Sequence, residues 1–313
     1  MASTLSSYLA HEAIDGDLAA AIAAAAAAAV EISALVRTAP LAGLTGLAGT
    51  ANVQGEAQKP LDVASNDIFL RAMRNVAAVS WAVSEEVDEA IAVNPGGTLG
   101  VLFDPLDGSS NLDVNVTVGS IFSIISAQSA DDLLQPGSAQ LAAGFAAYGP
   151  ATSMIIAVGG KAALFVLSEG EFLLVQDGLR IPAGYREYAI NSSREHLWDE
   201  GVRRYVAESN AAAERYNMRW VGSMVAEVQR ILNRGGVFLY PVDAETKAKG
   251  GRLRLLYEAN PMAYIARAAG GAASDGVTDM LAIVPTSIHQ RVGVVLGDAS
   301  EVARFEGFVR ATR

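Results

Sequence analysis

The chain has 313 residues, 51% of them hydrophobic and 18% charged, which is enough apolar surface for one large domain or two medium ones and excludes a mainly disordered state. Its 34 acidic and 23 basic residues give a formal net charge of −11, which argues against a nucleic-acid partner. The absence of cysteine excludes disulfides, thiolate zinc sites and cysteine nucleophiles.

The N-terminal part of the sequence favours helices. Residues 5–37 are rich in alanine and carry larger apolar side chains at intervals, which predicts one or two helices. The first basic residue is Arg37, a pattern that does not favour a signal peptide. The longest apolar run, Leu18–Val30, is mostly alanine and too short to span a bilayer. We therefore expect a soluble, cytoplasmic protein without a membrane partner.

The next segment predicts a loop, a helix and a strand. Several glycines punctuate the stretch from Gly43 to about Lys59, which is typical of a mobile loop. Ser65–Val79 has apolar residues at helical spacing, and Val79–Val83 is a short apolar strand. That strand stops directly before two glutamates, Glu85 and Glu86.

The middle of the chain is rich in strand patterns. Thr98–Phe103 is apolar and ends abruptly at Asp104, and Leu112–Val118 alternates apolar with polar residues, as in a half-buried strand. Later runs of the same kind predict a large, mostly antiparallel sheet. These runs are Phe122–Ser126, Ala142–Tyr148, Ser153–Val158, Ala163–Leu167 and Glu171–Val175.

Beyond about residue 184 the pattern changes to alternating strands and helices. Helices are expected over Glu195–Ala213, Met224–Asn233 and Asn260–Ala269, the last of them ended by two glycines. We expect a domain boundary there, with an N-terminal domain of helices and the large sheet over residues 1–184. An α/β domain over residues 185–313 would follow it.

Two predicted strands end in carboxylates, and this is the clearest chemical signal in the sequence. Glu85 and Glu86 follow one strand, and Asp104 and Asp107 follow another. Oxygen ligands of this kind suit Mg²⁺, which takes few of them from any single side chain. The pattern predicts a magnesium site.

The loop after the second strand sharpens that prediction. Pro105 restricts the backbone beside Asp104, so that both aspartates and the Leu106 carbonyl can face one point, and Gly108 allows a ligand to approach the backbone. Ser109 and Ser110 add hydroxyl and amide donors for a phosphate. The alternative is a solvated acidic turn, which uses the same residue types. The full octapeptide at a strand end favours the combined metal and phosphate site.

These residues also carry a resemblance. Asp104–Asn111, with the letters DPLDGSSN, resembles the signature of the metal-dependent, lithium-sensitive sugar and inositol phosphatase superfamily, and longer matches resemble class I fructose-1,6-bisphosphatases. The longer matches are Leu61–Asp67, Val83–Glu86, Val221–Ala226, Gly236–Pro241, Leu253–Ala263 and Ile288–Arg291. The resemblance implies a layered α+β or α/β fold in which two sheets are sandwiched by helices.

The resemblance also implies roles for individual residues. Asp62 and Glu86 would activate the attacking water, although Asp62 could instead be a helix-capping aspartate. The turn Gly108, Ser109 and Ser110 would hold the 1-phosphate. The implied metal ligands are Glu85, Glu86, Asp104, the Leu106 carbonyl, Asp107 and Glu258.

The implied sugar and 6-phosphate pocket lies in the C-terminal half. Arginines would offset the acidic field of the chain there, and Arg219 in the family reaches the neighbouring subunit's site. Trp220 stands where the family has tyrosine, and Arg252 where it usually has lysine, which leaves the choice between fructose and sedoheptulose bisphosphates open. The implied substrate-binding residues are Asn191, Arg219, Trp220, Met224, Tyr240, Arg252 and Arg254.

The resemblance implies a homotetrameric hydrolase that uses two or three Mg²⁺ ions, with Mn²⁺ as an alternative, to remove the 1-phosphate of fructose 1,6-bisphosphate. The pathway would be gluconeogenesis or the Calvin cycle. A dual fructose and sedoheptulose bisphosphatase and an inositol-monophosphatase-like enzyme are the enzymatic alternatives. A sugar-phosphate sensor without catalysis is the alternative of another class.

A regulatory site of the family is altered in this sequence. In animal and enterobacterial members, AMP binds between the first helix and the sheet, with a Lys-Tyr pair and an arginine around it. The resemblance aligns Thr98 and Leu99 with the pair and Ser126 with the arginine, and the helix offers mostly alanine. Burying a nucleotide phosphate without a cation is costly. We therefore predict an enzyme that is insensitive to AMP.

Overall fold

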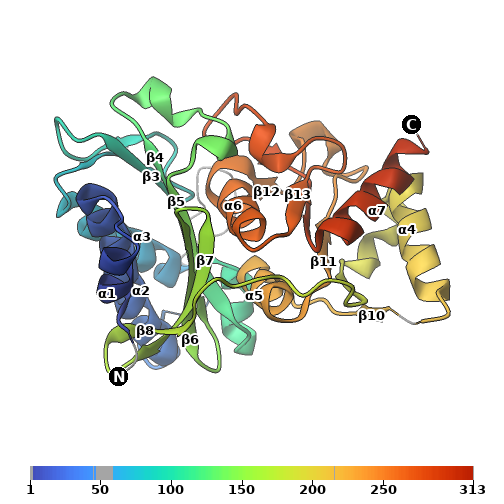
Figure 1. The fold of residues 1–313 in the computed structure, drawn as a ribbon, viewed down its shortest axis with the longest axis horizontal. Coiled ribbons are helices and arrows are strands. Elements are labelled where there is room, and N and C mark those ends of the chain that lie inside the picture. The colour runs from blue at the N-terminus through green and yellow to red at the C-terminus, as the bar shows by residue number, and fades with distance from the viewer. Residues whose placement is uncertain (1–2, 45, 47–58, 215, 313) are drawn as a thin grey trace.

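The computed structural model describes residues 3–44, 46, 59–214 and 216–312, so most of the predicted glycine-rich loop lies outside the described residues. The chain forms five layers, in which helices and sheets alternate (Figure 1). Helices α1–α3 cover one face of an eight-stranded sheet, α5 and α6 lie between that sheet and a five-stranded sheet, and α4 and α7 cover the outer face of the second sheet. The predicted layered fold with two sheets between helices is confirmed.

The helices follow the predicted segments with shifted ends. Residues 5–37 form two helices, as one of the two predicted alternatives had it. The helices are α1 (Leu5–His11), α2 (Gly16–Thr38), α3 (Pro60–Arg74), α4 (Glu200–Ala211), α5 (Met224–Arg234), α6 (Asn260–Ala268) and α7 (Ala299–Arg310). The predicted glycine end of α6 is confirmed, because Gly270 has a φ of +79° and its amide donates to the Arg267 carbonyl.

The large sheet has the strand order β2-β1-β3-β4-β5-β6-β7-β8, and its neighbours are antiparallel except for β1 and β3, which are parallel. The central strands are buried on both faces because helices cover both, which explains their continuous apolar sequence. The strands are β1 (Val79–Ser84), β2 (Ile91–Ala92), β3 (Leu99–Asp107), β4 (Val118–Ser126), β5 (Ala142–Tyr148), β6 (Thr152–Val158), β7 (Lys161–Ser168) and β8 (Glu171–Gln176).

The second sheet has the order β10-β9-β11-β15-β13, and a separate pair joins β12 and β14. One apolar cluster fills the space between the two large sheets, and another lies beneath α4 and α7. The strands are β9 (Glu187–Ala189), β10 (Asn217–Met218), β11 (Val237–Tyr240), β12 (Leu253–Arg254), β13 (Ala272–Ser274), β14 (Arg291–Val292) and β15 (Val294–Gly297).

Helix α2 corrects one sequence expectation. The apolar run Leu18–Val30 predicts a segment too short for a membrane, but α2 has 23 residues and is long and apolar enough to cross one by length and composition alone. In the structure it packs against α3 and the first sheet, and 44% of its most apolar window is buried. Alanines at its buried face allow that close packing, which fits a core helix.

The segment after β3 corrects another. Leu112–Val118 does not form a strand, because Ser109–Val114 is a 3₁₀ helix, and β4 begins only at Val118. Asn115, with a φ of +55°, ends the 3₁₀ helix in the left-handed conformation, which no regular strand accepts. Leu112 is half-buried and Val114 is exposed, so the alternation of apolar and polar residues does not mark the two faces of a strand.

Three element boundaries were also wrong. Strand β3 does not stop at Phe103 but continues to Asp107 through an irregularity between Asp104 and Asp107, where Pro105 needs no ladder hydrogen bond. Helix α3 begins at Pro60 rather than Ser65, since proline suits the first helical position. Helix α4 begins at Glu200, after a separate 3₁₀ turn over residues 192–197.

Candidate active site

The carboxylates of the two predicted strand ends meet at one edge of the large sheet. Strands β1 and β3 are parallel neighbours that pair Ser84 with Phe103, and the amide of Glu85 donates to the Phe103 carbonyl at 3.2 Å. The carboxyl ends of parallel strands lie at the same edge. Glu85, directly after β1, and Asp104, near the carboxyl end of β3, therefore lie at the same edge of the sheet, as the sequence predicted.

A third carboxylate joins them from a distant part of the chain. Oxygens of Asp104, Asp107 and Glu258 all lie within 4.8 Å of one another, and all three side chains are buried. Burial raises the pKa of Asp104 well above its ordinary value, and the charges of neighbouring carboxylates, Glu85 first among them, add to the shift. Burial also raises the pKa of Asp107 to about 6. This cluster needs positive charge to remain ionised.

Glu258 is placed by an unusual helical turn. Residues 255–259 form one turn of π-helix between β12 and α6, so Glu258 does not stand at a strand end as the sequence suggested. Its Oε2 accepts the amide of Arg254 at 2.6 Å. A π-turn redirects one side chain relative to a regular helix and is frequent at functional sites. Here it directs a carboxylate toward the strand ends of the other half of the chain.

Arg254 is buried among the carboxylates. Its Nη2 lies 2.8 Å from Oε1 of Glu85, and its Nη1 lies 3.8 Å from Oε2 of Glu258. Only 5% of the residue is exposed. The resemblance grouped Arg254 with the substrate-binding arginines, and the structure places it as a counter-ion of two predicted metal ligands.

These side chains line one cavity of about 320 Å³. Six carboxylates and two guanidinium groups face it, so its lining among the described residues has an excess of four negative charges. That excess fits hard cations held by oxygen ligands. The lining residues are Asp62, Glu85, Glu86, Asp104, Leu106, Asp107, Gly108, Ser109, Ser110, Gly222, Tyr240, Arg252, Leu253, Arg254 and Glu258.

Asp62 caps a helix, which is one of the two roles that the sequence left open, and it also lines the cavity. Its Oδ2 accepts the Lys59 amide at 2.7 Å, which caps the start of α3. Its Oδ1 is buried and has no hydrogen-bond partner within the described residues. Burial raises the pKa of Asp62, and the hydrogen bond from the Lys59 amide opposes that rise. One oxygen therefore fixes the side chain, and the other remains available as a proton acceptor beside the cavity.

The turn after β3 meets the start of α5. Gly108 has a φ of +75°, and a Cβ there would lie 3.1 Å from the side chain of Ser223, so the position needs glycine on two counts. Oδ2 of Asp107 accepts the Val225 amide at 3.0 Å, and Asn111 donates to the Gly222 carbonyl at 2.9 Å. The start of α5 and the residue Gly222 before it thereby hold the turn from the C-terminal half.

The predicted sugar-phosphate residues are brought together only in part. Tyr240 and Arg252 line the cavity with the carboxylates. Met224 is buried at the start of α5, outside the cavity lining. Trp220 stacks on Phe238 with ring centroids 6.1 Å apart and meets Tyr240 edge-on.

Two further predicted residues also lie outside the lining. Oδ1 of Asn191 accepts hydrogen bonds from the amide and hydroxyl of Ser193. The side chain of Arg219 is 47% exposed, and its Nε donates to Glu187. Both residues stand at ends of the β9 and β10 strands.

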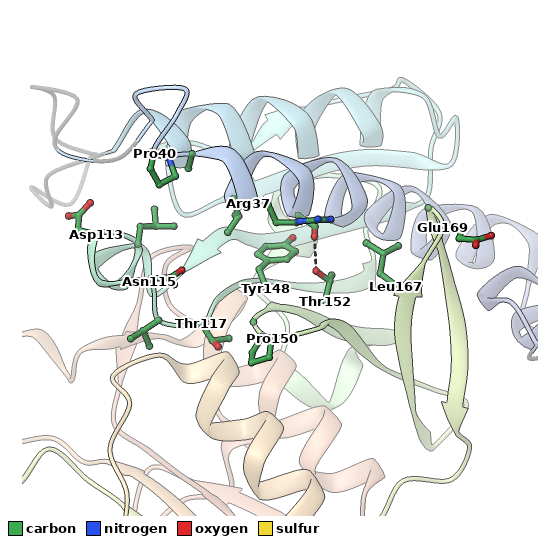
Figure 2. A pocket seen from close by; sticks show the side chains of 17 residues that line it. Arg37, Pro40, Asp113, Asn115, Thr117, Tyr148, Pro150, Thr152, Leu167 and Glu169 are labelled. Atoms are coloured by element: carbon green, nitrogen blue, oxygen red, sulfur yellow. Dashed lines mark hydrogen bonds between the residues drawn. The ribbon is translucent and has the colours of Figure 1, made fainter.

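A larger cavity, of about 1020 Å³, lies elsewhere. Figure 2 shows it beneath the end of α2, with Arg37 above and Tyr148, Pro150 and Thr152 below, and a 2.6 Å hydrogen bond between Ser33 and Thr152 beside it. None of the predicted site residues lines it. Among the described residues, its lining holds the carboxylates of Asp113 and Glu169 only, whereas six carboxylates line the smaller cavity.

Two cavity residues were not singled out from the sequence. Gly222 and Leu253 belong to matched stretches, but no role was assigned to either. In the sequence they could be found only by their neighbours: Leu253 lies between Arg252 and Arg254, and Gly222 lies between Trp220 and Met224. Backbone contact with a cavity depends on chain direction, which residue types do not reveal.

Comparisons with known proteins agree with this geometry. Two family models match the chain: "Fructose-1-6-bisphosphatase, N-terminal domain" over residues 5–177 and "Fructose-1-6-bisphosphatase, C-terminal domain" over residues 181–310. The class 1 fructose-1,6-bisphosphatase of Shewanella amazonensis is 44% identical over 97% of this chain and 99% of its own. That of Neisseria meningitidis serogroup A is 46% identical over 93% of this chain and 92% of its own.

A solved structure is similar over the whole fold. The crystal structure of Leishmania major fructose-1,6-bisphosphatase in holo form superposes with a TM-score of 0.95 at 33% identity, and 99% of each chain is covered. Both halves of the chain, including the strand ends that carry the carboxylates, thus share one known architecture. The chain belongs to the class 1 fructose-1,6-bisphosphatase family.

Proposed function

We propose that the carboxylate cavity hydrolyses the 1-phosphate of D-fructose 1,6-bisphosphate to give fructose 6-phosphate and inorganic phosphate. The activity itself, that of a class 1 fructose-1,6-bisphosphatase and hence of a phosphoric monoester hydrolase, follows from the family. One observation carries the choice of site: six carboxylates from four separate segments converge on a cavity that also holds a glycine-serine turn.

The donor set supports magnesium as the bound metal. We propose that two or three Mg²⁺ ions, or Mn²⁺ in their place, bind to the carboxylates around Asp104 and to the Leu106 carbonyl. Bound there, they would polarise the phosphoryl oxygens, lower the pKa of water and stabilise the leaving oxygen. The proposed ligands are Glu85, Glu86, Asp104, Leu106, Asp107 and Glu258.

The chain's own residues then have separate tasks. The free Oδ1 of Asp62, with Glu86 beside it, would accept the proton of the attacking water as the bond between phosphorus and the C1 oxygen breaks. The turn Gly108, Ser109 and Ser110 would hold the departing phosphate by amide and hydroxyl donors. The Lys59 hydrogen bond keeps Asp62 pointed at the reaction without occupying that oxygen.

The retained phosphate would lie toward the arginine side, which comprises Arg219, Trp220, Tyr240 and Arg252, with Arg219 reaching the site of the neighbouring subunit, as the resemblance implies. Tyr240 and Arg252 already line the cavity. A guanidinium group can donate two parallel hydrogen bonds to a phosphate. Asn191 and Met224 would complete the sugar pocket, as the resemblance implies. Arg254 would act at the other end, since it is paired with Glu85.

Trp220 favours a second candidate, a dual fructose and sedoheptulose bisphosphatase. Its Nε1 lies 3.6 Å from the place where a Cβ would stand on the cavity residue Gly222. An indole N–H can donate there but cannot accept, unlike the tyrosine hydroxyl that it replaces. The site's choice between a six-carbon and a seven-carbon sugar would depend on that donor.

Phosphate release over four substrates tests these proposals. With Mg²⁺ present, fructose 1,6-bisphosphate should be hydrolysed, whereas inositol 1-phosphate and AMP should not. Comparable turnover of sedoheptulose 1,7-bisphosphate would establish the dual enzyme. Hydrolysis of inositol 1-phosphate at the higher rate would contradict the assigned substrate, and a protein that binds the bisphosphate without releasing phosphate would be a sensor.

Three further proposals rest on the resemblance. We propose a homotetramer, a cytoplasmic location, and two domains that divide near residue 184. Sedimentation equilibrium measures the first directly, and a monomer at micromolar concentration would contradict it. Limited proteolysis near residue 184 tests the third.

A further inference from the structure

A buried charge network lies behind the arginine side. Glu187, at the start of β9, is fully buried, and its Oε2 accepts Arg219 Nε at 2.9 Å and Asn217 Nδ2 at 3.0 Å. Its other oxygen, Oε1, accepts Nη1 of Arg230, on α5. Both carboxylate oxygens of Glu187 are thus occupied by donors from two different elements.

A second buried carboxylate completes the network. Glu227, also fully buried, accepts Arg230 Nη2 at 2.8 Å and the amide of Val221 at 2.5 Å. Arg230 therefore bridges two carboxylates, and the second positive charge near them is that of Arg219. Together these bonds fix the segment 217–221 at both ends against β9 and α5.

Arg219 is the partly exposed member of this network. Its backbone amide donates to the Tyr188 carbonyl at 3.0 Å, which continues the pairing of β10 with β9. Within the described part of the chain, only Nε of its guanidinium has a hydrogen-bond partner, and 47% of the side chain is exposed. The anchored edge contains Nε, and the Nη groups at the forked end of the side chain keep N–H donors for a further partner.

We infer that Glu187 is a positioning residue, which anchors Arg219 by one edge so that its forked end is presented to the phosphate that the enzyme retains. The inference rests on the proposed function, because it takes Arg219 as a phosphate ligand. A freely rotating arginine would lose side-chain entropy on binding. An arginine held by a buried carboxylate has already lost most of this entropy before the substrate binds. Glu187 should therefore strengthen substrate binding without contacting the substrate.

The anchor predicts a change in KM and not in kcat. Glu187→Gln keeps an oxygen near Arg219 but removes the charge, and we expect KM for fructose 1,6-bisphosphate to rise about tenfold, because Arg219 is then less ordered before the substrate binds. The inhibition constant of fructose 6-phosphate should rise by the same factor. The value of kcat and the Mg²⁺ concentration for half-maximal rate should stay unchanged.

A double-mutant cycle separates positioning from a structural effect. Arg219→Ala should raise KM at least as much as Glu187→Gln, and the double variant should match Arg219→Ala alone, because Glu187 acts only through Arg219. Arg186→Ala is the matched control, since it removes an exposed arginine next to Glu187 that pairs with Glu214. Its KM should be that of the wild type.

Three results would overturn the inference. The first is a wild-type KM in folded Glu187→Gln while Arg219→Ala raises KM, which leaves the proposed phosphate ligand intact. The second is a double variant whose KM is the product of the two separate increases. The third is an unchanged KM in Arg219→Ala, which also removes Arg219 from the proposed substrate site.

Arg219→Lys keeps the test decisive if Glu187→Gln does not fold. This variant leaves the buried pair of Glu187 and Arg230 in place. Lysine keeps the charge, but its three donors share one freely rotating nitrogen, so it lacks the planar group in which Nε is anchored while separate Nη donors form a fixed fork. KM should approach that of Arg219→Ala, and a wild-type KM would contradict the anchor.

Discussion

The carboxylate end of the cavity and its arginine side are held in place by different kinds of structure. Asp104 and Asp107 belong to a buried strand in the middle of an eight-stranded sheet, so the backbone itself places their side chains. Arg219 and Arg252 project from a short edge strand and a loop, and other side chains must orient them. Substitutions at the carboxylate end should therefore alter chemistry and metal binding, and those on the arginine side should alter affinity.

The largest effect is expected at Asp104. Asp104→Asn should reduce kcat/KM more than about 100-fold, since even residues that only support a metal ligand cost 10–100-fold. The variant should stay folded, because it removes one of several buried like charges. Its Tm without metal should equal or exceed that of the wild type, and the rise in Tm on adding Mg²⁺ should shrink.

Glu85→Ala provides the parallel test directly after β1, with loss of turnover and of metal affinity expected. Phosphate release and a Mg²⁺ titration followed by thermal denaturation measure both. A variant at either position with wild-type turnover would contradict the metal assignment.

A substitution of Arg254 tests whether this arginine acts with the carboxylates or with the substrate-binding arginines. Arg254→Ala leaves Glu85 and Glu258 buried without their cation, and breaking such a pair costs about 3–5 kcal/mol. We expect a fall in Tm that Mg²⁺ largely reverses, and a lower kcat. Arg252→Ala is the matched comparison: it should keep the wild-type Tm and raise only KM. The same pattern in both variants would erase the distinction between the two ends.

The pH dependence of stability should report on Asp107. Its pKa is about 6 in the folded protein and 3.8 ordinarily, so the folded state holds more protons than the unfolded state between these values. The contribution of Asp107 to stability is therefore present below about pH 4 and is lost as the pH rises to about 6. In metal-free buffer, Asp107→Asn should gain Tm relative to the wild type over that interval. A constant difference from pH 4 to 7 would contradict the shift.

The smallest effect is expected for AMP, which should leave the phosphatase activity unchanged. The start of α2 is occupied by its own acidic residues: Asp15 accepts the amides of Asp17 and Leu18, and Asp17 adds a second charge. A phosphate there would displace a carboxylate and face another. Activity should persist at AMP concentrations that inhibit the animal enzyme. A micromolar inhibition midpoint would contradict this.

The carboxylate end could be predicted because its chemistry is local in sequence. The octapeptide from Asp104 to Asn111 holds two ligands, the turn glycine and the phosphate donors within one stretch, so residue types and order were sufficient. The same local logic failed directly afterwards, where alternation at Leu112–Val118 suggested a strand. Over so few residues, alternation does not distinguish a strand from a short helix, and the backbone conformation of Asn115 decides against the strand.

The arginine side could not be derived in the same way. Glu187 is an ordinary polar residue in the sequence, and only the packing of β9 against α5 shows that it is fully buried with two arginines. Arg254 looked equivalent to Arg252, two positions earlier, yet Arg254 is buried beside Glu85 and Arg252 is exposed at the same cavity. Such differences arise from contacts between distant segments.

Helix α2 has a consequence for how the first layer tolerates change. Its face toward the sheet is built largely of alanines, and Ala21, Ala25 and Ala29 are almost fully buried. Alanine has no side-chain rotamers to lose on folding, so this interface forms without that entropic cost. The same close packing between α2 and the sheet leaves no room for a larger side chain. Ala25→Leu should destabilise the fold by about 1–3 kcal/mol through overpacking, whereas the exposed Ala27 should accept leucine freely.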